Sequence, residues 1–268
     1  TGFGAVNGCP TYVFAQNGDV DGGAMSKAQA MKIRKVYDLA VKTGAPVIGI
    51  YDSIGGRLSE GADMMAAYGE ILLNSNNLSG VVPQISLVAG PCIGTSAMIA
   101  ASADIVVMTE KAELTVETSG ANGSAEAAAK LGVCHIVEKS EEDAINTVRN
   151  LVAALPSNNL EGAPITDALG MTSAAPLADN ADAKTVISAV ADDNTFVELG
   201  AKFGEACVTG IAQAAGSTVG FVSYTGVIDA DSCAKAARFV RFCDCFAIPV
   251  VSLVDAKEFA SLREATKL

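Results

Sequence analysis

The sequence has 268 residues, half of them hydrophobic, and no apolar run reaches the length of about 18 residues that is needed to cross a membrane. Its 18 Lys and Arg residues against 30 Asp and Glu residues give a net charge of −12, which argues against nucleic acid as a partner because phosphate binding needs a basic surface. Seven cysteines without a CxxC pair and a single histidine argue against a metal site and favour reduced thiols in the cytoplasm.

The first elements in the chain are two strands, a helix and a third strand. Residues 1–7 and 11–16 have strand-like patterns on either side of a glycine-containing turn. A helix is expected next, and Pro46 ends it. The continuously apolar segment 46–52 then predicts a strand that is buried on both faces. The apolar positions that recur at helical spacing are Ile33, Val36, Tyr37, Ala40 and Val41.

Further elements follow before the middle of the chain. Residues 60–68 predict a helix, and residues 81–88 predict another buried strand. The segment "GPCIGTSAMI" at 90–99 then places two glycines between this strand and an alanine-rich helix. Residues 104–109 and 131–139 both have the composition of strands.

The same supersecondary unit occurs twice in the sequence. Residues 1–15 match residues 209–223, and residues 32–52 match residues 235–255. Such self-similarity predicts a repeated ββα unit. The most distinctive matches within the second pair of segments are Lys32 with Lys235, Pro46 with Pro249 and Asp52 with Asp255.

The repeat predicts an α/β fold of two layered, superhelical domains. We expect an N-terminal domain over residues 1–155, a turn-rich linker over 156–183, and the start of a C-terminal domain over 184–268. The second domain has no counterpart of residues 80–150. This shortness, and the charged helix-like run at its end, indicate a piece of a longer polypeptide.

Three kinds of chemistry are considered for residues 90–99. They do not form a phosphate loop, because no lysine follows the second glycine. A serine peptidase would use Ser96 as nucleophile and His135 as base, although a lone histidine in a strand is commonly structural. Backbone N–H groups of Gly94 and Thr95, at the first turn of a helix, would instead form an oxyanion hole that suits an enolate at an acyl thioester. The remaining alternative is that Gly94 only lets the helix pack closely on the sheet.

Two loops are expected at one edge of the predicted sheet. Residues 52–61 and 90–95 follow neighbouring strands, and this edge is where α/β folds bind ligands. Gly55 and Gly56 give the first loop access to backbone conformations that other residues avoid. A basic cluster near the first helix suits either an anionic ligand or a solvated helix face. Its members are Lys27, Lys32, Arg34 and Lys35.

Four segments together resemble one protein family. They are "VNGCPTYVFAQNGDVDGGAMSKAQAMKI" from residue 6, "GAPVIGIYDSIGGRLSEGADMMAAYGEI" from residue 44, "SGVVPQISLVAGPCIGTSAMIAASADIVVMT" from residue 79 and "DSCAKAARFVRFCDCFAIPVVSLVD" from residue 231. The chain resembles the carboxyltransferase subunits of biotin-dependent acyl-CoA carboxylases. The same family includes subunits of acyl-CoA decarboxylase sodium pumps and of transcarboxylase.

The resemblance implies two crotonase-like domains with a ββα superhelix, the second of them incomplete, in a homo-hexamer. It implies carboxyl transfer between biotin on a carrier protein and a coenzyme A thioester, with membrane-pump subunits as further partners if the protein is a decarboxylase. The enolate oxygen would be held by the N–H groups of Gly94 and Thr95. The residues implied in acyl-CoA binding are Gly55, Gly56, Arg57, Cys92 and Ile93. From the basic cluster, Lys32 is the candidate contact for the CoA phosphates.

The chain departs from the family pattern at several positions. Ile54 stands where a glycine is common, Thr95 replaces the second glycine of the oxyanion motif, and "VDAKEF" at 254–259 replaces a proline–glycine loop. The second oxyanion motif would lie beyond Leu268. The chain is therefore interpreted as part of a longer subunit, as a half-length subunit with a separate complement, or as a catalytically degenerate structural paralogue in a carboxylase complex. A serine peptidase of the Clp type is the alternative from another class.

Overall fold

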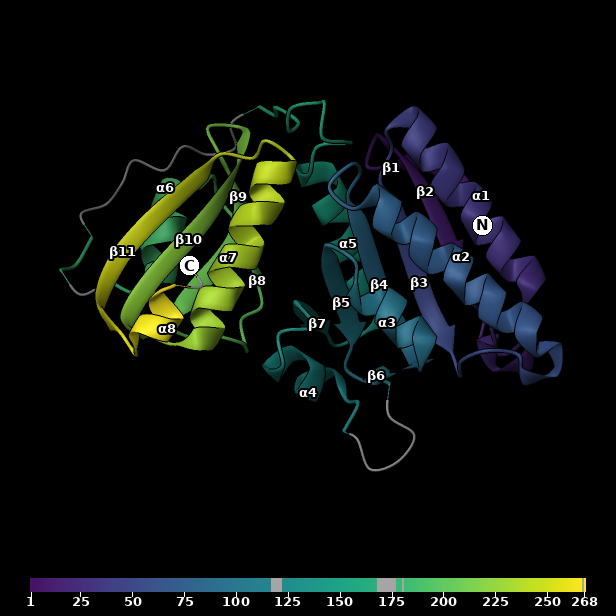
Figure 1. Cartoon of the computed structure of the whole chain (residues 1–268). Helices are drawn as coiled ribbons and strands as arrows, with labels where there is room; N and C mark the ends of the chain where they lie inside the picture. Colours follow the sequence, from purple (N-terminus) through teal and green to yellow (C-terminus); the bar gives the residue numbers. More distant parts are fainter. Residues whose placement is uncertain (117–121, 168–176, 180, 267) are drawn as a thin grey trace. The chain divides into compact units, whose positions relative to one another are not determined.

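The computed structural model describes residues 1–116, 122–167, 177–179, 181–266 and 268. The chain divides into two compact units (Figure 1). Unit 1 comprises Thr1–Ala153 and Ser157–Asn159, and unit 2 comprises Ala154–Pro156 and Leu160–Leu268. Residues 168–176 and 180 of the predicted linker lie outside the described residues. No helix in the described part of the chain is long and apolar enough to cross a membrane.

Unit 1 is a mixed sheet with helices packed against it. Its strands run in the order β1-β2-β3-β4-β5-β7, with β6 paired to β4, and only the β1–β2 pair is antiparallel. The long helices α1 and α2 lie side by side (Figure 1). The strands are β1 (Gly2–Val6), β2 (Cys9–Ala15), β3 (Val47–Ser53), β4 (Gln84–Ile93), β5 (Ile105–Thr109), β6 (Glu113–Thr115) and β7 (Ile136–Glu138). The α-helices are α1 (Lys27–Thr43), α2 (Ala62–Leu78), α3 (Thr95–Ala101), α4 (Ala125–Lys130) and α5 (Glu141–Ala154), and short 3-10 turns cover Asp21–Gly23 and Leu58–Glu60.

Helix α1 forms where the apolar spacing predicts it. The Ser26 side chain accepts a hydrogen bond from the Gln29 N–H and caps its start, and Gly44 ends it with a φ of 65°. Four of the five predicted apolar positions are buried in the core, whereas Val41 is 46% exposed. The buried four are Ile33, Val36, Tyr37 and Ala40.

Strand β4 differs from the prediction for residues 81–88. It begins only after Pro83 and continues to Ile93, through most of the segment expected as a glycine loop. The extension forms because Pro91–Ile93 pair with β6, whose residues Glu113–Thr115 lie parallel to them. Only Gly94 then separates β4 from α3.

Unit 2 contains the second copy of the ββα unit. Its sheet has the order β11-β10-β9-β8, and β10 lies antiparallel to β9 and parallel to β11. Helix α7 is capped by the Asp229 side chain, which accepts from the Ser232 N–H, and it buries Ala236, Phe239 and Cys243. The elements are α6 (Ala183–Val190), β8 (Val197–Leu199), β9 (Cys207–Ala214), β10 (Ser217–Ile228), α7 (Ala230–Cys245), β11 (Val250–Phe259) and α8 (Leu262–Ala265).

Residues 249–255 match the apolar segment 46–52 in the repeat and are therefore expected to form a strand that is buried on both faces, like β3. This expectation is wrong for β11 in unit 2 as described. Val251 is 38% exposed and Val254 is 73% exposed, although the strand is as apolar as its counterpart. The reason is topological. Among the described residues β11 pairs only with β10, so its second edge and much of its surface lack the neighbours that β3 has.

Candidate functional site

The two loops expected at one edge of the sheet do lie together in unit 1. Strands β3 and β4 are parallel neighbours, and Ser53 is paired with Cys92 where both strands end. A Cβ atom on Gly55 would lie 3.7 Å from the Ile93 carbonyl oxygen. Gly55 therefore lies close to the backbone that leads into α3.

The loop after β3 is held by backbone hydrogen bonds to Met25. The Met25 N–H donates to the Gly55 oxygen at 2.8 Å, and the Arg57 N–H donates to the Met25 oxygen at 2.8 Å. The Gly55 N–H donates to the Ser53 hydroxyl at 3.2 Å, and Gly55 itself has a φ of 113°. Between these bonds, the N–H of Gly56 has no hydrogen-bond partner among the described residues.

The turn after β4 places a second N–H group at the same edge. Gly94 has a φ of 66° and a ψ of −131°, a conformation that favours glycine, and it precedes the first residue of α3. Its own N–H donates to the Thr115 carbonyl oxygen at 2.8 Å. This bond corrects the expectation that the Gly94 N–H faces a ligand. The next N–H, that of Thr95, opens the helix and has no partner in the described part of the chain.

Arg57 is used within the protein at this edge. Its guanidinium lies 2.7 Å from the Asp21 carboxylate and 3.9 Å from that of Glu60, and the arginine side chain is 38% exposed. The Arg57 Nε is buried without a hydrogen-bond partner among the described residues. A carboxylate oxygen of Glu60 accepts from the Lys27 N–H at 2.7 Å, which ties the start of α1 to the same loop. The predicted binding role of Arg57 can therefore use only those N–H donors of its guanidinium that the two ion pairs do not engage.

The other predicted binding residues are Cys92 and Ile93 at the end of β4 and Lys32 on α1. The Cys92 side chain is fully buried, and desolvation raises the pKa of its thiol to about 12, so the thiol stays neutral. Ile93 is half-buried beside Gly55. Lys32 is exposed on α1 and has no ion pair within the described residues, unlike Arg34, which pairs with Glu70 at 3.3 Å.

A carboxylate that the sequence did not single out as a site residue supports this edge. Asp52 lies near the end of β3 and accepts a hydrogen bond from the Gly18 N–H at 2.9 Å. A side chain on Gly18 or Gly90 would collide with the Asp52 carboxylate, and one on Gly23 would collide with its carbonyl oxygen. The match of Asp52 to Asp255 in the repeat was the sequence signal that could have singled out Asp52. It does not show that Gly18, Gly23 and Gly90 pack against this residue.

The structure gives no support to a serine peptidase. The buried Ser96 hydroxyl is hydrogen-bonded to the Tyr68 hydroxyl at 2.9 Å. The Nδ1 atom of His135 accepts from the Val106 N–H at 2.9 Å, so the imidazole is tied to strand β5. Ser96 and His135 are thus each engaged elsewhere and are not joined as nucleophile and base.

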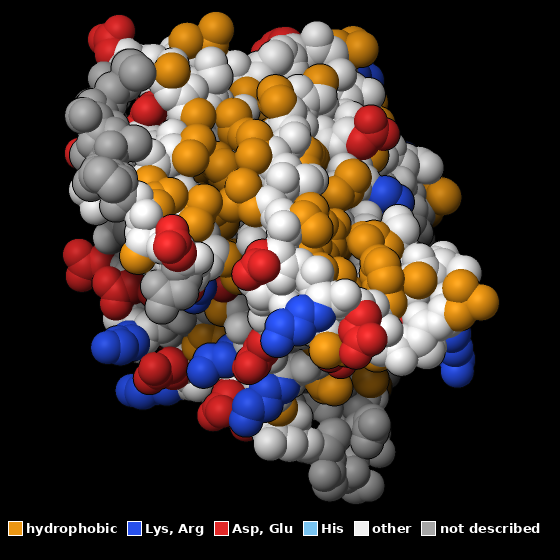
Figure 2. Space-filling model, turned by 90° about the vertical axis from the view of Figure 1, so that its left-hand side faces the viewer, with side chains coloured by type: hydrophobic (Ala, Val, Ile, Leu, Met, Phe, Trp, Pro, Cys, Tyr) orange, Lys and Arg blue, Asp and Glu red, His pale blue; other side chains and the backbone are white. Residues whose placement is uncertain are grey.

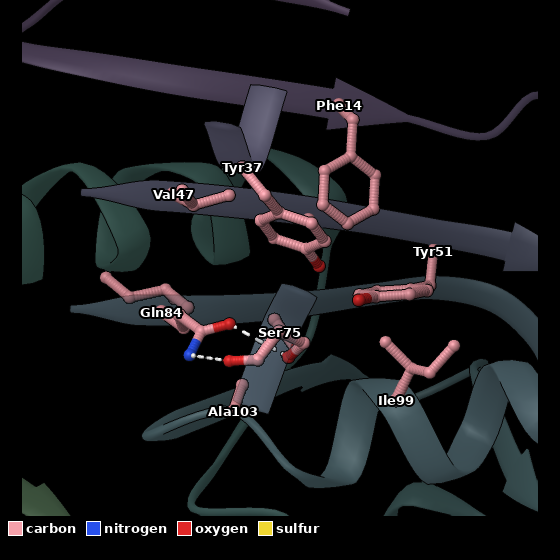
Figure 3. Close-up of a pocket in the computed structure, with 11 residues that line it drawn as sticks. Phe14, Tyr37, Val47, Tyr51, Ser75, Gln84, Ile99 and Ala103 are labelled. Carbon is pink, nitrogen blue, oxygen red and sulfur yellow. Dashed lines mark hydrogen bonds between the residues drawn. The ribbon is translucent and has the colours of Figure 1, made fainter. Parts of the chain in front are cut away.

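A small cavity lies in the core of unit 1 (Figure 3). It has a volume of about 10 Å³, room for about one water molecule, which excludes it as an acyl pocket. The Ser75 hydroxyl donates to the Gln84 side-chain oxygen at 3.0 Å, and the Gln84 amide donates back to the Ser75 carbonyl at 3.0 Å. Burial raises the pKa of Tyr37 and of Tyr51, which keeps both phenols neutral beside this pair.

Unit 1 is thus a mainly parallel α/β sheet in which the N–H groups of Gly56 and Thr95, after two adjacent strands, have no hydrogen-bond partner among the described residues. The family model of the carboxyl transferase domain matches residues 1–263, and the chain belongs to this family. This confirms the resemblance seen in the sequence.

Two curated relatives are similar over 97% of this chain. The methylmalonyl-CoA decarboxylase subunit alpha of Veillonella parvula is 35% identical, and the propionyl-CoA carboxylase beta chain of Roseobacter denitrificans is 36% identical. In both cases the chain spans only 57% of the relative's length. A transcarboxylase 12S structure, solved as a hexamer with hydrolysed methylmalonyl-coenzyme A bound, superposes with a TM-score of 0.90 at 30% identity, over 99% of this chain and 60% of the other.

Proposed function

We propose that this chain takes part in carboxyl transfer between an acyl-CoA and biotin carried by a partner protein, and that unit 1 holds the thioester. The observation that carries the proposal is the pair of N–H groups of Gly56 and Thr95, which have no partners among the described residues at the ends of β3 and β4. The names of the relatives, which act on propionyl-CoA and methylmalonyl-CoA, support an acyl-CoA as the substrate.

The chemistry of the site follows from these two donors. Removal of the α-proton or of the carboxyl group from an acyl thioester moves negative charge onto the thioester oxygen. Two preorganised N–H groups stabilise that charge more than they stabilise the neutral carbonyl, which lowers the barrier. The Gly94 N–H does not supply one of them here, because its bond to Thr115 instead fixes the turn that presents Thr95.

The phosphates of coenzyme A are negatively charged, and the protein itself has a net charge of −12. Binding them therefore needs a positively charged side chain close by. In the basic cluster near α1, Lys27 pairs with Asp63 at 3.1 Å and Arg34 with Glu70 at 3.3 Å. Lys32 and Lys35 are exposed and make no ion pair within the described residues. We therefore keep Lys32 as the candidate phosphate contact and add Lys35.

Biotin supplies or accepts the carboxyl group when its carrier protein is bound, but the described residues of unit 2 do not form a complete counterpart of the unit 1 edge. Strand β11 is followed by α8, and no strand pairs with it in the position that β4 has beside β3. No step through biotin is therefore assigned to residues of this chain.

The proposal includes the wider organisation expected of the family. We infer two crotonase-like domains, at residues 1–155 and 184–268 with a linker over 156–183, of which the second is incomplete. A homo-hexamer that binds a biotin carboxyl carrier protein is the proposed assembly, by analogy with the hexamer described for transcarboxylase 12S.

A structural paralogue without catalysis remains the second candidate function. Two features favour it: the Gly94 N–H is already bonded to Thr115, and a threonine side chain stands at the position where the family pattern has a second glycine. The two candidates differ in what they predict for the Thr95 N–H: only the catalytic proposal expects carboxyl transfer to depend on it.

The test removes one donor without removing the helix. Thr95→Pro eliminates the N–H at the first helical position, where proline is well tolerated, and Thr95→Ala keeps the N–H as the matched control. In the complete assembly we expect Thr95→Pro to slow carboxyl transfer about 10²–10³-fold, and Thr95→Ala to stay within a few fold of the parent. Equal rates for the two variants would contradict the assigned donor, and no transfer by the parent would support the structural paralogue.

A further inference from the structure

The two proposed N–H donors differ in what fixes their direction. A trans peptide is planar, so its C=O and N–H groups point in opposite directions. The Gly94 carbonyl, which shares a peptide with the Thr95 N–H, accepts from the Met98 N–H at 3.3 Å within α3. The Thr95 N–H is therefore directed by its own helix. The Gly56 N–H lies in a loop and depends on contacts with other segments of the chain.

Met25 fixes the direction of the Gly56 N–H. The Gly55 carbonyl shares a trans peptide with this N–H and accepts from the Met25 N–H at 2.8 Å, so the Gly56 N–H points away from Met25. A second bond, from the Arg57 N–H to the Met25 oxygen at 2.8 Å, completes a short parallel bridge between Met25 and Gly56. A displacement of Met25 would therefore rotate the peptide and turn the donor.

Helix α2 packs against Gly56. A Cβ atom on Gly56 would collide with the Met64 side chain and would lie 3.0 Å from Cε2 of Tyr68. Both of these residues belong to α2, and Tyr68 is 6% exposed. The helix leaves the loop no room to shift in its direction, so the position of Met25 decides how the peptide lies.

The Glu60 side chain holds the segment that carries Met25. This methionine stands two residues before Lys27, the first residue of α1. A Glu60 carboxylate oxygen accepts from the Lys27 N–H at 2.7 Å, and Glu60 follows Gly56 by four positions. A carboxylate at a helix start is stabilised by the charge-assisted bond and by the helix dipole. Glu60 thereby joins the start of α1 to the loop that presents the Gly56 N–H.

This contact differs from the ion pairs of the protein surface. Figure 2 shows a face on which Lys and Arg side chains lie among Asp and Glu side chains. Exposed pairs contribute little to stability, and an example in unit 1 is Lys130 with Glu126 at 2.8 Å, with side chains 63% and 68% exposed. The Glu60 side chain is 27% exposed and binds a backbone N–H, whereas its distance to the Arg57 guanidinium is 3.9 Å.

We infer that Glu60 is a positioning residue for carboxyl transfer, which acts through the Lys27 N–H and the Met25 bridge to keep the Gly56 N–H directed at the thioester oxygen. It touches neither the substrate nor the reacting atoms. The expected effect on rate rests on the proposed function, whereas the bridge itself is tested without substrate. Loss of a donor costs about 10²–10³-fold in rate, and a misdirected donor costs part of that.

The test uses three substitutions in the complete assembly. Glu60→Ala removes the acceptor of the Lys27 N–H. Glu60→Gln keeps an acceptor oxygen there but removes the charge that faces Arg57. Asp63→Ala is the control, because Asp63 pairs at 3.1 Å with the side chain of the same lysine. The measurements are kcat and KM of carboxyl transfer, and hydrogen exchange of the Met25 and Arg57 amides without substrate.

In Glu60→Ala we expect kcat to fall about tenfold with KM within about twofold, because only the transition state needs the directed donor. The Met25 and Arg57 amides should exchange about tenfold faster. Glu60→Gln and Asp63→Ala should stay within about threefold of the parent in both measurements.

Three results would overturn the inference and leave the proposed function intact. They are unchanged amide exchange in Glu60→Ala, faster exchange at an unchanged rate of transfer, and a Glu60→Gln variant as slow as Glu60→Ala. The last result would show that the charge beside Arg57 matters rather than the bond to the Lys27 N–H. An absence of transfer by the parent would instead contradict the proposed function, and the positioning role would fall with it.

Discussion

The Gly94 N–H donates a hydrogen bond to the Thr115 carbonyl oxygen at 2.8 Å, and this contact determines which donors the site has. It joins the turn before α3 to the end of β6, so the short strand fixes the position of the helix start. Thr95 thereby becomes the first residue at this turn whose N–H points to no protein acceptor in the described part of the chain. Together with Gly56 it forms the two-donor arrangement that we propose for the thioester oxygen.

Ser96 separates the two enzyme classes considered for the sequence. We expect Ser96→Ala to retain carboxyl transfer within a few fold, because the proposed donors are backbone groups that alanine preserves. A serine peptidase would instead lose its activity with this nucleophile. The measurement is the rate of both reactions for the parent and the variant, and a loss of carboxyl transfer of 100-fold or more, about the effect of removing an oxyanion donor, would contradict a backbone site.

The Tyr68–Ser96 hydrogen bond is expected to stabilise the base of α3. Tyr68→Phe leaves the buried Ser96 hydroxyl without its partner, which costs about 1–3 kcal/mol of unfolding free energy. The double variant Tyr68→Phe/Ser96→Ala should be destabilised by less than the sum of the single changes, since both remove the same bond. Urea unfolding of the four proteins measures this, and strictly additive effects would show that the hydroxyls do not interact.

Gly90 is expected to tolerate no side chain. A methyl group there collides with the Asp52 carboxylate, which is held by the Gly18 N–H, so Gly90→Ala should cost about 1–3 kcal/mol. Gly69 is the matched control, because it lies in α2 with open space around it, and Gly69→Ala should stabilise by about 0.5–1 kcal/mol. Thermal unfolding distinguishes the two, and similar melting temperatures for both variants would refute the packing of Asp52.

The buried thiols make stability fall at alkaline pH. Burial raises the pKa of Cys92, Cys134 and Cys243 to about 12 in the folded protein, while unfolded thiols ionise near pH 8.5. Above that pH the unfolded state binds fewer protons than the folded state, so each such thiol lowers the unfolding free energy by up to about 1.4 kcal/mol per pH unit. The stability is fully present below pH 8.5 and is lost progressively up to about pH 12.

Urea unfolding between pH 7 and pH 10.5 tests this slope. Cys243→Ala should reduce the slope by the contribution of one thiol. A slope that is equal in the parent and in Cys243→Ala would show that the Cys243 thiol does not ionise on unfolding in this range.

Local periodicity was sufficient to predict helix α1 and the neighbouring positions of the loops that follow β3 and β4. The spacing of Ile33, Val36, Tyr37 and Ala40 predicted α1, and the order of two buried strands placed their following loops together. The bond from Gly94 to Thr115 was not predictable, because it depends on pairing with β6, a strand of three residues without a distinct pattern.

The ion pairs of Arg57 and the burial of β11 depend on contacts between segments that are far apart in the chain, so local patterns did not predict them. Arg57 was expected to face a ligand, but Asp21, 36 positions earlier, forms its shortest ion pair. The repeat correctly indicated an apolar β11, but burial of that strand requires neighbours outside the described unit.

The most direct test of the site is the vibrational frequency of a bound thioester carbonyl. Propionyl-CoA labelled with ¹³C at the carbonyl is bound to the complete assembly, and its isotope-edited infrared band is compared between the parent, Thr95→Ala and Thr95→Pro. Two hydrogen bonds from Gly56 and Thr95 polarise the carbonyl, so we expect a shift to lower frequency in the parent and in Thr95→Ala that is reduced in Thr95→Pro. A band at the solution frequency in the parent, or an identical band in all three proteins, would contradict the claim that these backbone groups hold the thioester oxygen.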